Sequence, residues 1–418
     1  MINHKSLEAV KGGRWSQGRF SRPLYESYSF SKIPGTLQRL LGVEGDALPQ
    51  DCWRGDKYDS VVLFLIDGFG WEFLEKHHAK YPFLARFFRE GLVSQLTSQF
   101  PSTTAAHITT LCSGEEVGQT GIYEWYMYEP LLDRVIAPLL YSFAGDHQTS
   151  SLKEAISPEK IFPEETLFQK LAKKGIASTV YQHESIAHSM YSNWMFRGST
   201  FMPFRKFSEG LSSLGDQVSK GGLFYIYFGD IDAEAHRHGM DSEPVKKAMD
   251  HCFQTLERCW EELSKLSNKV ACIVTADHGM TAIDPKTTYF LNQKIPELEK
   301  CFCKGQNGRP LTPAGSCRDY FLHLLPEKME EAQELLQKEL EGQALICKTA
   351  QLIEEGFFGS KAVLPAFLSR VGNLVILPYE NNSVWWYEKG RFEQKFHAMH
   401  GGLTPPEMET IFLFASNL

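Results

Sequence analysis

Residues Ala271–Met280 read A-C-I-V-T-A-D-H-G-M, a short apolar run that ends in an acid, an imidazole and a glycine. Such a run, with β-branched residues, is typical of a strand buried in a parallel sheet. In open α/β sheets, ligands bind beyond the carboxyl ends of the strands, where Asp277 and His278 would lie. Zinc-like ions accept a carboxylate and an imidazole together. A surface turn with two polar residues is the alternative, and this pair alone does not decide between the two.

Two further apolar runs lead into acidic segments. Val61–Ile66 (V-V-L-F-L-I) is followed by Asp67, and Leu223–Phe228 (L-F-Y-I-Y-F) by a segment that contains Asp232. A carboxylate that faces a buried strand end is costly unless it is paired or binds a metal. Asp232 stands four residues before His236, so the two could share one face of a helix or form a local ion pair.

A fourth strand, predicted over Leu92–Leu96, leads into hydroxyl groups instead of an acid. The segment F-P-S-T-T ends at Thr104, and helical spacing follows over Ala105–Cys112. Thr104 would therefore lie at a helix N-terminus, where free N–H groups and the helix dipole favour an anion. An ordinary helix N-cap is the commoner role for a threonine at such a position.

Each of these residues also has a simpler structural explanation. Asp67 before a glycine fits a turn, Thr104 fits a cap, and His400 between Met399 and Gly401 fits a loop. These explanations would have to hold independently at every position. One shared site at the carboxyl edge of the sheet is the more economical hypothesis.

The composition limits the classes of function. The chain has 418 residues, of which 43% are hydrophobic, and a formal net charge of −8. No block of lysine or arginine stands out, so we expect no nucleic-acid polymer as a partner. No stretch approaches the ~20 apolar residues of a membrane span, and the first residues lack the apolar core of a signal peptide. Nine scattered cysteines, an odd count, favour free thiols, so we expect a cytoplasmic protein.

The chain divides into three predicted regions. Residues 1–58 are expected to form an irregular N-terminal extension packed on the core, with a short helix at Thr36–Leu41. Residues 59–280 and 396–418 carry the strand-end motifs and form the predicted catalytic core. From 281 to 395 the pattern changes to shorter strands and a charged helix, which predicts an inserted α+β cap subdomain.

Together the motifs resemble those of the type I phosphodiesterase/nucleotide pyrophosphatase family of the alkaline phosphatase superfamily. The matching pieces are V-V-L-F-L-I-D-G at 61–68, F-P-S-T-T at 100–104, D-A-E-A-H-R-H-G at 232–239, T-A-D-H-G-M at 275–280 and H-G-G at 400–402. Their order and spacing cover most of Val61–Phe414. The resemblance implies an α/β fold, an alkaline phosphatase-like three-layer αβα sandwich with a central, mostly parallel sheet and a smaller inserted α+β subdomain.

The resemblance also implies two divalent metal ions, with zinc as the expected metal. One ion would be held by Asp67, Thr104, Asp277 and His278, and the other by Asp232, His236 and His400. Thr104 would be the nucleophile, activated by metal coordination. Two ions would stabilise both the attacking and the leaving oxygen of an in-line displacement. Carboxylates and imidazoles around one hydroxyl suit zinc, whereas calcium prefers oxygen ligands alone.

Neighbouring residues compete for some of these roles. Thr103 is the alternative nucleophile. Asp230 lies near Asp232, but only Asp232 has the four-residue spacing to His236. His238 is expected either to take no part in the metal site or to contact one of the metal ligands without binding the metal itself.

Substrate contacts are expected on the helix after Thr104 and in the loop beyond it. Many family members carry an Asn three residues after the nucleophile, and this chain has His107 there. His107 could hold a phosphate oxygen or could simply pack on the helix. Tyr123 and Trp125 are candidates to stack on a base, with a lid packed on itself as the alternative. The departure at His107 leaves the preference between phosphate monoesters and diesters open.

The implied activity is metal-dependent cleavage of phosphodiester or pyrophosphate bonds in small, nucleotide-type phosphate esters through a covalent phospho-threonine intermediate. A phosphomonoesterase or phosphonate hydrolase of the same superfamily is the first alternative. Sulfatase chemistry is disfavoured, because the segment Thr104–His107 lacks the Cys/Ser-x-Pro-x-Arg motif. A non-catalytic binding protein on this scaffold is a remote alternative, because the whole set of ligands is present.

Overall fold

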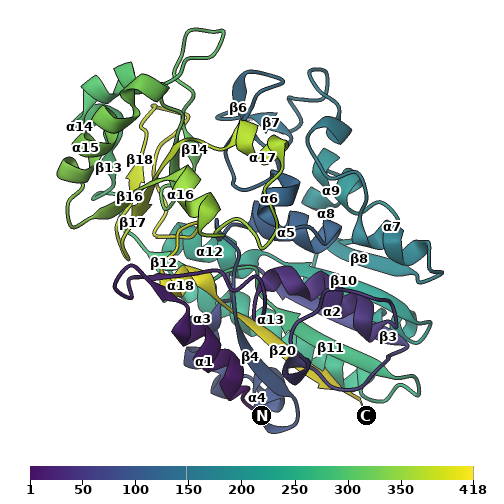
Figure 1. Ribbon diagram of the computed structural model, residues 1–418. Helices are drawn as coiled ribbons and strands as arrows, with labels where there is room; N and C mark the ends of the chain where they lie inside the picture. The colour runs from purple at the N-terminus through teal and green to yellow at the C-terminus, as the bar shows by residue number, and fades with distance from the viewer. Residues whose placement is uncertain (147, 418) are drawn as a thin grey trace.

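A seven-stranded sheet forms the centre of the computed structural model, which describes residues 1–146 and 148–417 (Figure 1). In spatial order its strands are β4 (Leu92–Thr97), β20 (Glu409–Ser416), β11 (Val270–Thr275), β3 (Ser60–Ile66), β10 (Gly222–Phe228), β8 (Ser178–His183) and β9 (Thr200–Phe204). Neighbouring strands from β11 to β9 pair in parallel, and β20 is antiparallel to β11 and β4. The predicted central, mostly parallel sheet is confirmed.

Helices cover both faces of this sheet, which is why its strands are apolar throughout. Alternate side chains of β3 enter two different apolar clusters: Val61, Leu63 and Leu65 on one face, and Val62, Phe64 and Ile66 on the other. The first face packs against α2 (Ile33–Leu40), α5 (Thr104–Ser113) and α7 (Leu167–Ala172). The second packs against α3 (Trp71–His77), α4 (Pro82–Arg89) and α13 (Glu243–Leu263). The predicted three-layer αβα sandwich is confirmed.

The N-terminal region contains more regular structure than the sequence indicated. Helix α1 (His4–Gly12) begins at Asn3, whose side chain accepts a hydrogen bond of 3.3 Å from the Ser6 N–H. The expectation of an irregular segment is therefore wrong for α1, because a local cap and a buried Val10 stabilise a helix that has little apolar periodicity. Helix α1 lies beside β4, and α2 starts three residues before the predicted helix.

A second sheet lies within residues 281–395, drawn in green and yellow-green at the upper left of Figure 1. Its strands, in order, are β14 (Ala314–Gly315), β15 (Tyr320–Leu322), β17 (Leu374–Pro378) and β16 (Ala344–Lys348). Helix α15 (Met329–Glu339) packs on it around a separate apolar cluster. Strands β5 (Met127–Glu129), β6 (Arg134–Ala137) and β7 (Ser142–Phe143) form a further small sheet, which a backbone bridge between Tyr126 and Gly315 joins to β14.

Short elements connect these layers. The helices are α6 (Val117–Thr120), α8 (Glu184–Ala187), α9 (Met190–Met195), α10 (Phe207–Gly210), α11 (Leu214–Val218), α14 (Leu291–Lys294), α16 (Thr349–Glu354), α17 (Pro365–Arg370) and α18 (Pro405–Met408). Three strand pairs are β1 (Arg14–Trp15) with β2 (Phe20–Ser21), β12 (Thr281–Ala282) with β19 (Ala398–Met399), and β13 (Tyr289–Phe290) with β18 (Val384–Trp385). Across the described ranges, no helix is both long and apolar enough to cross a bilayer.

Candidate active site

The predicted site residues converge at the carboxyl edge of the central sheet. Asp67 directly follows β3, and Asp277 and His278 follow β11 after a single alanine. Thr104 is the first residue of α5, which the chain reaches from β4. Helix α12 (Asp230–His238), which begins just after β10, supplies Asp232 and His236, and His400 follows β19. The parallel topology thus brings together residues that are far apart in the sequence.

Four of these residues form an inner cluster: Asp67, Thr104, Asp277 and His278. The Thr104 hydroxyl oxygen lies 3.2 Å from His278 Nε2 and 3.5 Å from Asp67 Oδ1. His278 Nε2 also lies 3.3 Å from Asp277 Oδ2 and 3.6 Å from Asp67 Oδ1. The ligand atoms of Asp67, Asp277 and His278 all lie within 4.8 Å of one another, close enough to hold one ion.

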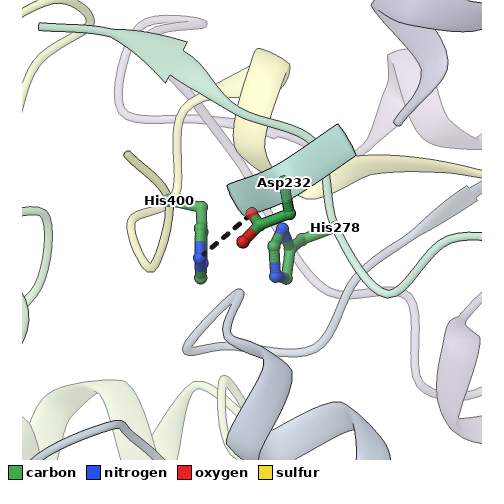
Figure 2. Close-up of side chains that lie close together, drawn as sticks. All are labelled: Asp232, His278 and His400. Carbon is green, nitrogen blue, oxygen red and sulfur yellow. Dashed lines mark ion pairs between the residues drawn. The ribbon is translucent and has the colours of Figure 1, made fainter. Parts of the chain in front are cut away.

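The other three form an outer cluster: Asp232, His236 and His400. Asp232 Oδ2 lies 3.3 Å from His236 Nε2, and Asp232 Oδ1 lies 3.7 Å from His400 Nε2. The two clusters touch, because the rings of His278 and His400 stack with their centroids 3.6 Å apart. Figure 2 shows Asp232 beside these two rings, with a dashed line from its carboxylate to His400, and Asp232, His278 and His400 also have ligand atoms within 4.8 Å of one another. His278 therefore lies within reach of both groups.

The three imidazoles present the same nitrogen to the carboxylates. In each ring Nδ1 meets a backbone carbonyl: Ala398 for His236 at 2.7 Å, Gly279 for His278 at 3.0 Å and Ser102 for His400 at 2.9 Å. A carbonyl can only accept a hydrogen bond, so Nδ1 carries the proton and donates. The Nε2 lone pair then points into the cluster, as in histidines that bind metals.

The electrostatics of the two clusters favour a bound cation. Burial and the charges of Asp277 and Asp232 raise the pKa of Asp67 well above its usual range. Burial and Asp232 raise the pKa of Asp277 to about 7. Burial lowers the pKa of His278 and His400, which keeps both rings neutral. Asp232 Oδ1 and Asp277 Oδ2 are buried and accept no hydrogen bond from the described residues. Unsatisfied carboxylate oxygens beside imidazole lone pairs fit a divalent metal of the zinc class.

The two candidate threonines have different roles in α5. Thr103 is the N-cap: its hydroxyl oxygen accepts from the Ala106 N–H at 3.4 Å, and its hydroxyl donates to the Tyr123 carbonyl at 3.2 Å. The Thr104 hydroxyl is left to face Asp67 and His278. This arrangement favours Thr104 over Thr103 as the reacting hydroxyl. Asp230 and His238 are exposed and lie outside both clusters, and His238 Nε2 lies 3.4 Å from a carboxylate oxygen of Glu234.

Two of the three predicted substrate contacts are buried. His107 Nε2 accepts from the Gln99 N–H at 2.8 Å, and Nδ1 donates to the Thr103 carbonyl at 2.7 Å. Neither nitrogen is free for a phosphate oxygen, so the expectation of a phosphate contact is corrected in favour of packing on the helix. Tyr123 is also fully buried, and its hydroxyl donates to the Arg370 carbonyl at 3.2 Å. Trp125, by contrast, is 38% exposed and lies at the cavity described next.

A cavity of about 480 Å³ opens beside the two clusters. Its wall includes Thr104, Asp232, His236 and His400, together with the aromatic side chains of Trp125, Tyr126, Trp385, Phe392 and Phe396. Arg237 and Arg391 also line it, and each forms a 2.8 Å ion pair with a glutamate. No motif in the sequence pointed to Trp385, Phe392 or Phe396, although they come within about fifteen residues before His400.

Ser102 connects the segment that leads into Thr104 to the segment that carries His400. Its carbonyl accepts the hydrogen bond from His400 Nδ1, and its hydroxyl donates to the Gly402 carbonyl at 2.7 Å. The Gly401 N–H donates back to the Ser102 hydroxyl oxygen at 3.1 Å. Ser102 thus holds His400 of the outer cluster in place through contacts that no local sequence pattern indicated.

Comparison with known proteins identifies related sequences and folds. The sequence profile of Type I phosphodiesterase / nucleotide pyrophosphatase matches residues 61–403. Ectonucleotide pyrophosphatase/phosphodiesterase family member 7 from Mus musculus is 23% identical over 237 residues, which is 54% of this chain and 51% of that protein. The Homo sapiens protein of the same name is 22% identical over 237 residues, 54% of this chain and 49% of its own length. The chain thus spans about half the length of the curated relatives it matches.

Solved structures share the fold. Murine ectonucleotide pyrophosphatase / phosphodiesterase 5, as an inactive form in complex with AMP, aligns with a TM-score of 0.63 and 18% identity, over 85% of this chain and 87% of that one. Phosphonoacetate hydrolase from Sinorhizobium meliloti 1021, in complex with phosphonoformate, aligns with a TM-score of 0.59 and 17% identity, over 84% and 89% of the two chains. Both similarities support the alkaline phosphatase-like architecture.

Proposed function

The chain belongs to the type I phosphodiesterase/nucleotide pyrophosphatase family, and we propose that it is a metal-dependent hydrolase of phosphodiester or pyrophosphate bonds. Nucleotide-type esters are the proposed substrates, and Thr104 is the proposed nucleophile. The observation that carries the proposal is the position of the Thr104 hydroxyl. Its oxygen lies 3.2 Å from His278 Nε2 at the start of α5, in a cavity that also reaches the outer cluster.

The proposed cofactor is a pair of zinc-type ions. Asp67, Thr104, Asp277 and His278 would hold one, and Asp232, His236 and His400 would hold the other. The donor set supports zinc, because imidazoles and carboxylates together suit a borderline-soft ion. When bound, ions of this kind lower the pKa of a coordinated hydroxyl and stabilise negative charge on the reacting oxygens.

The proposed reaction has two displacements at phosphorus. In the first, the Thr104 oxygen forms a bond to phosphorus, the hydroxyl proton is released, and the bond to the leaving oxygen breaks. In the second, a water oxygen attacks the phospho-threonine, the bond to the Thr104 oxygen breaks, and Thr104 regains a proton. The first turn of α5 supports both steps, since backbone N–H groups at a helix N-terminus favour a phosphoryl group.

The size and lining of the cavity favour a diester over a monoester. About 480 Å³ beside Thr104 leaves room for a second ester arm, and the aromatic wall suits a flat organic group. The AMP complex of the murine fold relative is consistent with a nucleotide arm. Phosphonate hydrolysis is the second candidate function, because a phosphonoacetate hydrolase shares the fold and covers a similar share of the chain.

A substrate panel on wild type, Thr104→Ala and Thr103→Ala tests the proposal. We expect wild type to cleave a chromogenic phosphodiester and a dinucleotide faster than p-nitrophenyl phosphate or phosphonoacetate, and to lose activity in EDTA. Thr104→Ala should lower kcat at least about a thousandfold, as the loss of a nucleophile does in other hydrolases. Thr103→Ala is the matched control: it should cost about 1 kcal/mol of stability as a lost cap and keep most of the activity. Full activity of Thr104→Ala, or activity that resists EDTA, would exclude the proposed mechanism.

A further inference from the structure

Tyr227 lies at the carboxyl end of β10, beside the end of β3. The parallel register pairs Tyr227 with Leu65, and the Asp67 N–H donates to the Phe228 carbonyl at 2.9 Å. The Tyr227 hydroxyl reaches across and donates a hydrogen bond to Asp67 Oδ2. The two strands thus bring a phenol directly against a proposed metal ligand.

The two oxygens of Asp67 have different partners as a result. Oδ2 accepts from Tyr227, whereas Oδ1 lies 3.5 Å from the Thr104 hydroxyl and 3.6 Å from His278 Nε2. The Asp67 side chain is only 4% exposed, so water competes little for either oxygen. Because the Tyr227 hydroxyl engages Oδ2, Oδ1 is the oxygen that Asp67 can present to an ion.

A second tyrosine on the same strand lacks such a partner. Tyr225 lies two residues before Tyr227, so both side chains project from the same face of β10. Both pack against the apolar cluster on that face of the sheet. The Tyr225 hydroxyl is buried and makes no hydrogen bond to any described residue. The contact of Tyr227 with Asp67 is therefore specific to one of two similar positions.

We propose that Tyr227 is a positioning residue that fixes Asp67 for the inner ion, a role that rests on the two-metal function proposed above. Supporting donors behind metal ligands are worth about 10- to 100-fold in affinity in other metalloproteins. Tyr227 would act on the inner ion, because its hydroxyl donates a hydrogen bond to Asp67 and, among the described residues, to none of the three outer side chains. The sequence motif V-V-L-F-L-I-D-G contains Asp67 but not Tyr227, which lies on the neighbouring strand β10.

The test compares wild type, Tyr227→Phe and Tyr225→Phe as purified full-length proteins. Zinc content and affinity are measured by elemental analysis and by competition with a chromogenic chelator. We expect Tyr227→Phe to bind one of its two ions about 10- to 100-fold more weakly, with the other ion unchanged. Tyr225→Phe, which removes a hydroxyl without a partner, should keep both affinities within about threefold. Added zinc should restore the kcat of Tyr227→Phe, because the lesion is in binding and not in the chemical step.

Cadmium-113 NMR resolves the two ions directly. In the cadmium-substituted proteins, Tyr227→Phe should shift or broaden one of two resonances, and Tyr225→Phe should shift neither. Wild-type affinity and an unchanged spectrum in Tyr227→Phe would overturn the role of Tyr227 while leaving the two-metal function intact. Equal weakening by both variants would also overturn it, because the effect would then be general to this face of β10. Failure of wild type to bind two ions would refute the proposed function and the role of Tyr227 together.

Discussion

The inner and outer clusters contain similar ligands but are built differently. Asp277 and His278 are fully buried and Asp67 is 4% exposed, and all three follow central strands of the sheet. In the outer cluster, the side chains of Asp232, His236 and His400 are 13 to 16% exposed. Two of them lie on the short helix α12, and His400 lies in a segment that follows residues 281–395, which carry the second sheet. A ligand set at buried strand ends is held by the whole core, whereas one on a short helix and a loop depends on a few local contacts.

This difference predicts that the outer cluster is the easier one to disrupt. Gly401 has a φ of +121°, and a Cβ there would meet three oxygens: Ser316 Oγ at 2.6 Å, Asp319 Oδ1 at 2.8 Å and Glu124 Oε1 at 3.0 Å. Gly401→Ala must therefore displace these side chains or shift the backbone next to His400, and the positive φ adds strain in either case. We expect the outer ion to bind about 10- to 100-fold more weakly, by analogy with the loss of supporting contacts elsewhere, while the inner ion is retained.

Gly342→Ala is the matched control for Gly401→Ala. Gly342 also has a positive φ, +74°, but its added Cβ would have no neighbour within 4 Å. The control carries the backbone strain of about 1 kcal/mol without the clash, so it should lower the melting temperature slightly and leave zinc affinity unchanged. If Gly401→Ala released both ions together, the two clusters would not be independent.

The clusters should also differ in how they couple stability to pH in the metal-free protein. The pKa of Asp277 is about 7 in the folded protein, against about 3.9 for an unfolded Asp, so the native state holds the extra proton between these values. The free energy of unfolding of wild type should fall as the pH rises through this window, because the buried Asp277 carboxyl group ionises. Asp277→Asn has no such group to ionise and should not show this fall. The free energy of unfolding of Asp277→Asn, relative to wild type, should therefore rise by about 1–2 kcal/mol from pH 5 to pH 7.

Asp232 has a pKa shift of the opposite sign to that of Asp277. Its pKa is lowered in the folded protein, despite burial, by His236 and His400, so its stabilisation is present above the unfolded pKa. Because Asp232 also, despite burial, raises the pKa of His236, Asp232→Asn removes a charged pair that is strongest below the pKa of His236. Asp232→Asn should thus destabilise the metal-free protein more at pH 5 than at pH 7, as followed by urea unfolding. A difference for Asp277→Asn that does not change with pH would contradict the raised pKa of Asp277.

The sequence predicted which residues gather in the two clusters better than it predicted their surroundings. Asp67 and Asp277 could be identified because an apolar run followed by an acid is a local pattern, and a parallel sheet then gathers such strand ends at one edge. The role expected for His107 was wrong because its partners, the Gln99 N–H and the Thr103 carbonyl, depend on how β4 leads into α5.

Contacts between distant elements could not be predicted from the sequence alone. Tyr227 meets Asp67 only because of the register of β10 on β3, and Ser102 meets His400 only because the chain returns to the central sheet after residues 281–395. Trp385, at the wall of the cavity, comes from the same distant region. The family resemblance implied Thr104 as the nucleophile with Thr103 as the alternative, and the cap geometry of Thr103 favours the same choice.

The measurement that most directly tests the division into two clusters is the zinc content of Asp277→Asn and Asp232→Asn after dialysis against a weak chelator. Each variant should retain about one ion per chain, while wild type retains two. In the cadmium-substituted proteins, Asp277→Asn should lose the resonance that Tyr227→Phe perturbs, and Asp232→Asn should lose the other one. Loss of both ions in either variant, or loss of the same resonance in both, would contradict two separable metal sites.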